Sequence, residues 1–115
     1  FNTLTDLDFF SDAIEAVTGW DFDRNKVTKA GKRIVNLFRS FNIRHGITAD
    51  LDYPSPRYGS IPIDGPAKGS NILRYWEEML RIYYKEMGWD VKTGKPLPET
   101  LKELGLDFVI SDLWK

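Results

Sequence analysis

The chain has 115 residues, of which 42% are hydrophobic and 29% charged, a balance typical of one folded domain rather than a disordered tail. Its net charge is −1 and no basic stripe stands out, which argues against nucleic acid as a partner. It contains no cysteine, so these residues form no disulfide and hold neither a zinc–thiolate site nor a cysteine-ligated iron–sulfur cluster.

The first predicted helix runs from about Leu7 to Thr18, because apolar residues recur there at helical spacing. Thr5 followed by Asp8 resembles a capping box at its start. Gly19 is placed to end the helix in the left-handed conformation, and we expect Trp20 to pack back on the last turn.

The second predicted helix runs from about Arg24 to His45, with Asp23 as its N-cap and Gly46 as its stop. Its apolar residues share one broad face, which favours packing against two neighbours. That face comprises Val27, Ala30, Gly31, Ile34, Val35, Leu37, Phe38 and Phe41. The opposite face carries Lys29, Lys32, Arg33, Asn36 and Ser40.

Residues 46–69 are predicted to form a long loop, because four prolines and three glycines fall within them. A structureless connection of this length is unusual in a small domain and is typically functional, or lies on another surface. The loop therefore indicates that the chain comes from something larger, as does a first residue that is not methionine.

The third predicted helix runs from about Asn71 to Met87 and is expected to be capped by Ser70. Its apolar stripe of Trp, Tyr and Met residues predicts core packing rather than a cofactor site. The stripe comprises Ile72, Tyr75, Trp76, Met79, Leu80, Ile82, Tyr83 and Met87. The helix ends in 88–90, Gly-Trp-Asp, which repeats 19–21 and indicates one capping arrangement used twice.

A short fourth helix is predicted from about Pro98 to Leu104, with Gly105 as its stop. The tail, 106–115, is apolar enough to dock, and 108–110 could pair as a strand. The expected fold is therefore all-α: one irregular multihelical domain over 1–115, with about four helices and a long Pro/Gly-rich loop.

The order of these features resembles the C-terminal domain of the aldehyde ferredoxin oxidoreductases. The segments that carry the resemblance are 19–21, 31–34, 36–37, 39–46, 52–57, 65–69, 83–84, 88–90, 94–96 and 101–106. Together they cover nearly the whole chain. Two departures indicate a divergent member: His45 stands where the family often has Glu, and Pro54-Ser55 stands where Leu-Pro is common.

The resemblance implies a parent enzyme that oxidises aldehydes to carboxylic acids with ferredoxin as electron acceptor. Such enzymes hold tungsten, sometimes molybdenum, in a bis-pterin cofactor beside one [4Fe–4S] cluster. In the family the cluster cysteines and the pterin-binding motif lie before the segment that matches this chain. We therefore expect no cofactor, metal ligand or catalytic residue in the chain itself, whose partners would be the N-terminal domains of its parent.

Four residues near the end of the second helix are candidates for lining a cofactor or substrate cavity: Arg39, Asn42, Arg44 and His45. Either arginine could bind a pterin phosphate, but a structural or solvated role is favoured. Asn42 could face a cavity or tie down the loop that follows. His45, the only histidine, could exchange protons with a substrate, although stabilising the helix C-terminus is the favoured role.

Two further features are open to more than one interpretation. Glu86 could be a buried carboxylate with a raised pKa, or it could pair with an arginine such as Arg57 or lie at a frayed helix end. The segment 65–69, Gly-Pro-Ala-Lys-Gly, lacks the spacing of a phosphate-binding loop and favours a turn.

Two other functions remain open on the sequence alone. One is a helical interaction module unrelated to any enzyme. The other is a small hydrolase using Glu86, His45 or Asp carboxylates, although no Ser–His–Asp or metal-ligand spacing supports it. With no recognisable signal peptide and no apolar run near the roughly 20 residues of a membrane span, the expected location is the cytoplasm, without a membrane partner.

Overall fold

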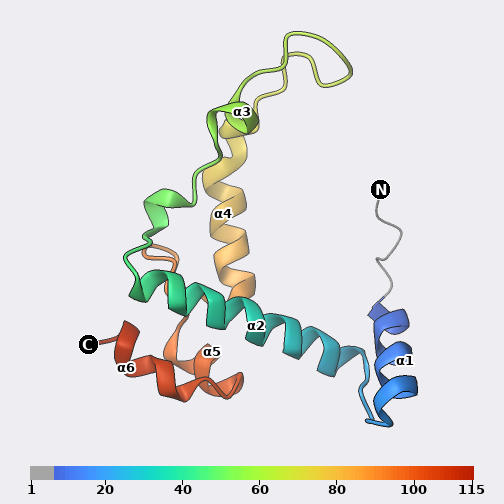
Figure 1. Ribbon diagram of the computed structural model, residues 1–115. Coiled ribbons are helices and arrows are strands. Elements are labelled where there is room, and N and C mark those ends of the chain that lie inside the picture. The colour runs from blue at the N-terminus through green and yellow to red at the C-terminus, as the bar shows by residue number, and fades with distance from the viewer. Residues whose placement is uncertain (1–6) are drawn as a thin grey trace.

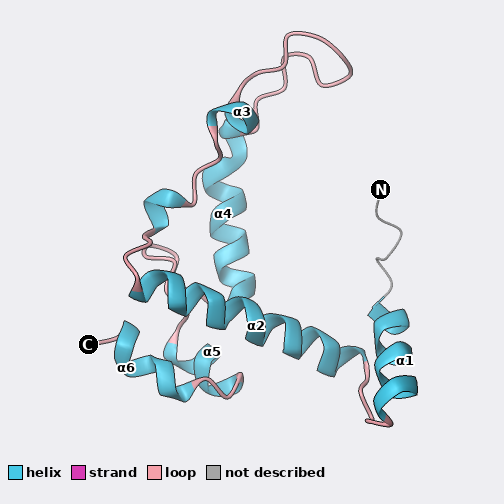
Figure 2. Cartoon of the chain, viewed as in Figure 1, coloured by secondary structure: helices cyan, strands magenta, loops and turns pink. Residues whose placement is uncertain are grey.

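The computed structural model describes residues 7–115, and these fold into helices joined by loops and turns (Figure 1). In chain order the elements are α1 (Leu7–Thr18), α2 (Arg24–Arg44), η1 (Ala49–Leu51), α3 (Pro56–Gly59), α4 (Leu73–Met87), α5 (Pro98–Glu103), η2 (Asp107–Val109) and α6 (Ile110–Leu113). Figure 2 shows no strand in this part of the chain, where the only β contact is an isolated bridge between Trp89 and Pro96. The all-α prediction is confirmed, and each of the four predicted helices is present.

The long helix α2 organises the molecule. In Figure 1, α1 lies across its N-terminal end, α4 rises from its middle, and the C-terminal helices α5 and α6 lie on its other side. The tip of the loop between α3 and α4 projects furthest from α2. None of the helices in residues 7–115 is both long and apolar enough to cross a membrane.

The helix ends follow mostly from local sequence. Asp23 caps α2, since its carboxylate accepts a hydrogen bond of 2.8 Å from the backbone N–H of Lys26. The predicted start of α4 is wrong by two residues. Ser70 lies in the preceding turn, where its N–H donates to the Ala67 carbonyl. The side chain of Asn71 accepts from the Leu73 N–H in the position predicted for Ser70. The predicted capping box at Thr5 lies outside the described residues.

The two Gly-Trp-Asp segments end their helices in only partly the same way. Gly19 and Gly88 are both left-handed, with φ of 71° and 68°. Trp89 donates its backbone N–H to Tyr84 and is buried, as in a Schellman ending. Trp20 donates to the Thr18 hydroxyl instead and is 64% exposed. The prediction that it packs back on its helix is therefore wrong.

The prediction that the whole segment 46–69 is a loop is wrong in part. It contains η1 and α3, each a single short turn of helix. The remainder is a loop, and the predicted turn at 65–69 is confirmed by hydrogen bonds of 3.1 Å from Lys68 N–H to Gly65 and 2.9 Å from Gly69 N–H to Pro62.

The hydrophobic core lies at the C-terminal end of the chain. It is formed by Leu101, Leu104, Leu106, Val109 and Leu113, with Ile43 and Ile110 packed against it. The tail therefore docks, as predicted, and the segment considered able to pair as a strand, 108–110, is helical. The indole of Trp114 donates to the Pro96 carbonyl at 2.8 Å, which fastens the tail to the preceding turn.

The two long helices do not bury the faces that their periodicity predicts. In α2 the buried residues are Asn36, Arg39 and Ser40, while most of the apolar face is exposed. In α4 only Tyr84 is buried, and most of the predicted core stripe is about half exposed. Hydrophobic periodicity identifies which residues share a face but does not identify what covers that face.

The chain is extended for its length. Its radius of gyration is 17.7 Å, whereas a compact domain of this size has about 13 Å. It exposes 8952 Å², whereas a globular monomer of 13.3 kDa exposes about 6,500 Å². Roughly 2,500 Å² more surface is exposed than a self-contained domain of this mass would show.

Candidate functional site

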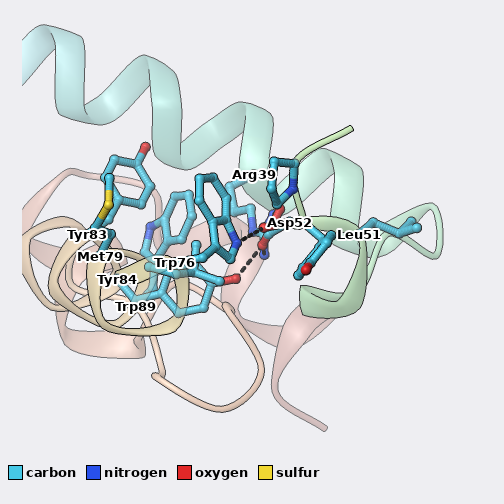
Figure 3. A pocket seen from close by; sticks show the side chains of 11 residues that line it. Arg39, Leu51, Asp52, Trp76, Met79, Tyr83, Tyr84 and Trp89 are labelled. Atoms are coloured by element: carbon cyan, nitrogen blue, oxygen red, sulfur yellow. Dashed lines mark hydrogen bonds and ion pairs between the residues drawn. The ribbon is translucent and has the colours of Figure 1, made fainter. Parts of the chain in front are cut away.

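A polar cluster joins α2, α4, the end of η1 and a turn, and we call its residues Arg39, Asp52, Tyr84 and Gly94 the latch. Figure 3 shows the first three of these. The Arg39 guanidinium, from α2, forms two hydrogen bonds with the Asp52 carboxylate, of 2.8 and 2.5 Å. Its Nε donates to the Gly94 carbonyl at 2.9 Å. The Tyr84 hydroxyl donates to Asp52 as well. Arg39 is thus held in a planar, two-pronged geometry that lysine cannot reproduce.

Aromatic rings enclose the latch. The Arg39 guanidinium lies 4.8 Å from the ring centre of Trp89 and 5.8 Å from that of Tyr84, within the range of cation–π attraction. The indole N–H of Trp89 donates to the side chain of Asn36 at 2.8 Å, which explains why a second polar residue of α2 is buried. Within residues 7–115 no buried side-chain nitrogen or oxygen lacks a partner.

The latch holds Asp52 ionised and Tyr84 neutral. Burial raises the pKa of Asp52, but hydrogen bonds from Arg39 and Tyr84 outweigh it, and the pKa lies below its usual value. Burial, together with the hydrogen bond to Asp52, raises the pKa of Tyr84 to about 12. At neutral pH the cluster is therefore an arginine–carboxylate pair with a phenol donating to it.

Gly94 allows the latch to close. It has a φ of 64°, and a Cβ placed there would lie 2.3 Å from Nη2 of Arg39 and 2.9 Å from the Tyr84 hydroxyl. Only glycine combines that backbone conformation with this close approach. The turn 90–94 is itself held by Asp90, whose carboxylate accepts from the N–H and the hydroxyl of Thr93.

A cavity of about 500 Å³ opens beside the latch, between η1 and α4. Its lining is Arg39, Leu51, Asp52, Tyr53, Pro54, Trp76, Met79, Leu80, Tyr83, Tyr84 and Trp89. Figure 3 shows Met79 and Tyr83 at the opposite side of these side chains from Asp52. The Trp76 indole donates to the Asp52 carbonyl at 3.0 Å, so the wall from η1 and the wall from α4 are joined.

The chemistry of the cavity is that of a binding surface. Its volume and aromatic lining match those of pockets that enclose small apolar groups. Its one cation, Arg39, is paired with its one carboxylate, Asp52, in the latch, and the hydroxyls of Tyr53 and Tyr83 are further polar groups of the lining. The cavity is therefore suited to receive an apolar or aromatic group.

The four residues predicted to line a cavity are not brought together. Only Arg39 lies in the cavity, where it has the favoured structural role. Asn42 is exposed, and its backbone carbonyl, not its side chain, accepts from Ile47 of the following loop. Arg44 pairs with Asp112 of α6 at 3.1 Å, with its side chain 64% exposed.

His45 caps the C-terminus of α2. Its backbone N–H reaches the carbonyls of Phe41 and Asn42, and its Nδ1 lies 2.8 Å from the Phe41 carbonyl. The imidazole stacks on the Phe41 ring, 4.1 Å between centres. This geometry supports the helix-terminal role over the proton-exchange role.

Glu86 is exposed near the C-terminal end of α4, so it is not a buried carboxylate. Its backbone carbonyl accepts from the Lys32 ammonium at 3.4 Å.

The sequence analysis does not identify Asp52, Tyr84 and Trp89 as site residues. One pattern pointed to them: Asn36 and Arg39 lie three residues apart, on the side of α2 away from its apolar stripe, and two such groups need partners when buried.

The residues present do not fit the metal centres that the resemblance implies. The chain has no cysteine for a cluster, and residues 7–115 contain no group of three or more His, Asp or Glu side chains placed to hold a metal ion. The two arginines considered for a pterin phosphate, Arg39 and Arg44, are both paired with carboxylates. No chemical step is therefore assigned to such a centre in this chain.

Comparison with known proteins places the chain in a family. The family model for aldehyde ferredoxin oxidoreductase, domains 2 & 3, matches residues 1–106. The tungsten-containing aldehyde ferredoxin oxidoreductase of Pyrococcus horikoshii is 39% identical over 102 residues, covering 87% of this chain and 16% of that protein. The enzyme of the same name from Pyrococcus furiosus is 39% identical over 101 residues, covering 86% and 16%.

A solved structure matches as well. The active-site complex BamBC of benzoyl coenzyme A reductase, bound to 1,5-dienoyl-CoA, superposes with a TM-score of 0.72 and 31% identity. The match covers 92% of this chain and 15% of that one. The chain belongs to the aldehyde ferredoxin oxidoreductase family and corresponds to a part of its domains 2 and 3. It spans about one-sixth of the length of the curated relatives it matches, 16%.

Proposed function

We propose that this chain is the C-terminal helical part of an oxidoreductase that oxidises aldehydes to carboxylic acids with ferredoxin as acceptor. The observation that carries the proposal is the 39% identity, over 87% of the chain, to a tungsten-containing aldehyde ferredoxin oxidoreductase. Tungsten or molybdenum in a bis-pterin cofactor, with one [4Fe–4S] cluster, would be held by the rest of the protein, because these residues offer no ligand set for either.

The proposed role of this chain is to line part of the substrate cavity, without taking part in the chemical reaction. Its aromatic cavity is proposed to complete the side of the substrate cavity, with the latch fixing η1 against α4 so that the walls keep their shape. The isolated chain would then show no turnover. Its satisfied latch and its apolar lining both support a positioning role.

The complete gene product tests the proposal. We expect its reading frame to carry a cysteine-rich cluster motif and a further cysteine shortly before the segment that matches this chain. The purified protein should contain tungsten or molybdenum together with iron, and it should reduce ferredoxin when an aldehyde is added. A protein without these metals and without aldehyde-dependent reduction would contradict the proposal, and would leave a non-enzymatic helical interaction module as the better description.

The role of the cavity has a test with a matched control. Met79 and Ile82 lie on α4 with nearly equal exposure, 47% and 48%, but only Met79 lines the cavity. In the complete enzyme, Met79→Ala should raise KM for bulky aromatic aldehydes roughly tenfold, the effect of losing about 1–2 kcal/mol of apolar contact. Ile82→Ala should leave KM within about twofold. Equal effects of the two variants, in steady-state kinetics, would contradict the assignment.

A second candidate function follows from the structural match. The benzoyl coenzyme A reductase complex shares 31% identity and the fold over 92% of this chain, and it binds a dienoyl-CoA. An enzyme of that kind reduces an aromatic thioester instead of oxidising an aldehyde. The two candidates are separated by incubating the complete protein with an electron-accepting dye and either an aldehyde or 1,5-dienoyl-CoA. Reduction of the dye then shows which of the two compounds the protein oxidises.

A further inference from the structure

Four exposed apolar side chains form a line along α2, and we call them the ridge: Ile34, Leu37, Phe38 and Phe41. Their exposed fractions are 55%, 42%, 65% and 59%. They follow the three- and four-residue spacing of one helix face, and they enclose a shallow hollow lined by no other residue. Contiguous apolar surface of this kind on a soluble chain marks a contact site.

The ridge cannot be buried by turning α2 about its axis. The opposite face is fixed by Asn36, whose side chain accepts from Trp89, and by Arg39, which bonds to Asp52 and to the Gly94 carbonyl. Rotation would break these buried hydrogen bonds and leave a guanidinium without its carboxylate. These hydrogen bonds therefore hold the ridge on the side of α2 that faces away from Trp89 and the turn 90–94.

The ridge continues into a groove between α2 and the C-terminal helices. The groove has a volume of about 210 Å³, and Leu37 and Phe41 line it together with Phe108, which is 67% exposed. At its edge, Arg44 and Asp112 neutralise each other in an ion pair of 3.1 Å. The surface thus presents a row of large apolar side chains, a groove beside it, and no net charge, which suits an apolar helix as occupant.

We propose that the ridge and its groove are the docking surface for an apolar helix in the preceding part of the same polypeptide. The proposal rests on the proposed function, since it requires the longer parent protein. The chain spans only 16% of the length of its curated relatives, so in an enzyme of that size far more polypeptide lies outside this chain than within it. The roughly 2,500 Å² of excess exposed surface is of the size that an obligate interface buries.

Hydroxyl-radical footprinting of the complete protein, read by mass spectrometry, tests the docking directly. If a helix covers the ridge, Phe38 and Phe41 should be modified at least about tenfold more slowly than the same residues in the urea-unfolded protein, since the centre of such an interface is dry. Modification of both at rates close to those of the unfolded protein would overturn the proposal. A rate that rises on dilution to the monomer would assign the ridge to a second copy of the chain and would overturn it as well.

Paired variants of the complete protein give a second readout. Phe38→Glu and Lys29→Glu each place a glutamate on α2, with a larger change of net charge at Lys29, but Lys29 lies on the side away from the ridge. Limited proteolysis should release the C-terminal part at least about tenfold faster from Phe38→Glu, while Lys29→Glu and the conservative Phe38→Leu should match wild type. Equal release from all three variants would contradict docking at the ridge.

These measurements are separate from those that test the proposed function. A protected ridge in a protein without tungsten, molybdenum or aldehyde turnover would refute the oxidoreductase and leave the docking in place. A metal-loaded, active enzyme whose ridge is freely modified would refute the docking alone.

Discussion

Asp52 is the residue on which the latch depends, since it accepts hydrogen bonds from both Arg39 and Tyr84. The Arg39 side chain is only 8% exposed and that of Asp52 is 23% exposed. Removing the carboxylate charge leaves a buried guanidinium facing a neutral group, whose desolvation is then uncompensated.

We expect Asp52→Asn to lower the free energy of unfolding by about 2–3 kcal/mol, toward the low end for a buried pair because Asp52 keeps some contact with water. Urea titration followed by tryptophan fluorescence measures it, because Trp76 and Trp89 both lie at the latch. The neighbouring Asp50 is exposed, so Asp50→Asn serves as the control and should change stability by less than about 0.5 kcal/mol. Similar losses in the two variants would contradict the assigned role of Asp52.

The same groups predict how stability depends on pH. The pKa of Asp52 is lowered in the folded protein, so its contribution is present above the unfolded value of 3.8 and is lost as the pH falls through the lower, folded value. The pKa of Tyr84 is raised to about 12, so its contribution is complete below 10.0 and is lost as the pH rises toward 12.

Tyr84→Phe should therefore remove the alkaline loss of stability that Tyr84 causes and weaken the acid one, since Asp52 loses one of its donors. Thermal unfolding of both proteins across the pH range measures the difference. If the alkaline limb of the profile is unchanged in the variant, Tyr84 is not the group responsible.

At the scale of elements, the turn 90–94 approaches the side chains of Arg39 on α2 and Tyr84 on α4 closely. Gly94 and Gly65 have similar left-handed backbones, with φ of 64° and 73°, but only Gly94 has side chains within reach of a new Cβ. Gly65→Ala should cost about 1 kcal/mol for the backbone alone. Gly94→Ala should cost roughly 1–3 kcal/mol more, because Arg39 must leave the latch to make room. Denaturant titration of both variants measures the difference, and equal costs would show that the close approach to Arg39 is unimportant.

Helix ends could be predicted well from the sequence because capping is local. Asp23, Gly88 and Gly105 act within a few residues of where they stand, so their effects follow from spacing alone. The exception is α4. Ser70, its predicted cap, lies in the preceding turn, and the helix begins at Leu73. The family, likewise, could be recognised from an ordered set of short segments and is confirmed by comparison.

Helix faces could not be predicted, because what covers a face is not local. The apolar stripe of α2 is predicted to pack against two neighbours, but periodicity does not say which, and within this chain Asn36 and Arg39 occupy the buried side. The latch could not be predicted either, because its contacts are not local in the sequence. Its four residues come from two helices, the position after η1 and a turn, and no spacing in the sequence brings Asp52 to Arg39.

At the scale of the whole molecule, the chain is a thin, branched body, with principal extents of 52 × 42 × 20 Å. Its main hydrophobic core occupies only the C-terminal end. Most large apolar residues of α1, α2 and α4 are at least one-third exposed. The latch fixes α4 against α2, so these two helices do not bury their apolar faces against each other.

We therefore expect the chain, produced alone, to keep its branched shape and to bind the apolar dye ANS, which the complete protein would bind weakly. Small-angle scattering at low concentration should give a radius of gyration near 17.7 Å. A value close to about 13 Å would show that the chain collapses to a compact domain by itself. In that case the exposed faces of α2 and α4 are not reserved for a partner.

The polar side of α2 also has a consequence for the order of folding. Asn36 and Arg39 find their partners 53 and 55 residues further along the chain, at Trp89 and Gly94. Contacts of such long sequence separation close late, because a large loop must be ordered before they form. During synthesis α2 leaves the ribosome with neither of its long faces covered. Its polar side is buried only after Trp89 and the turn 90–94 have been synthesised. Ribosome-bound chains that stop before Gly94 would thus be the stage most in need of chaperones.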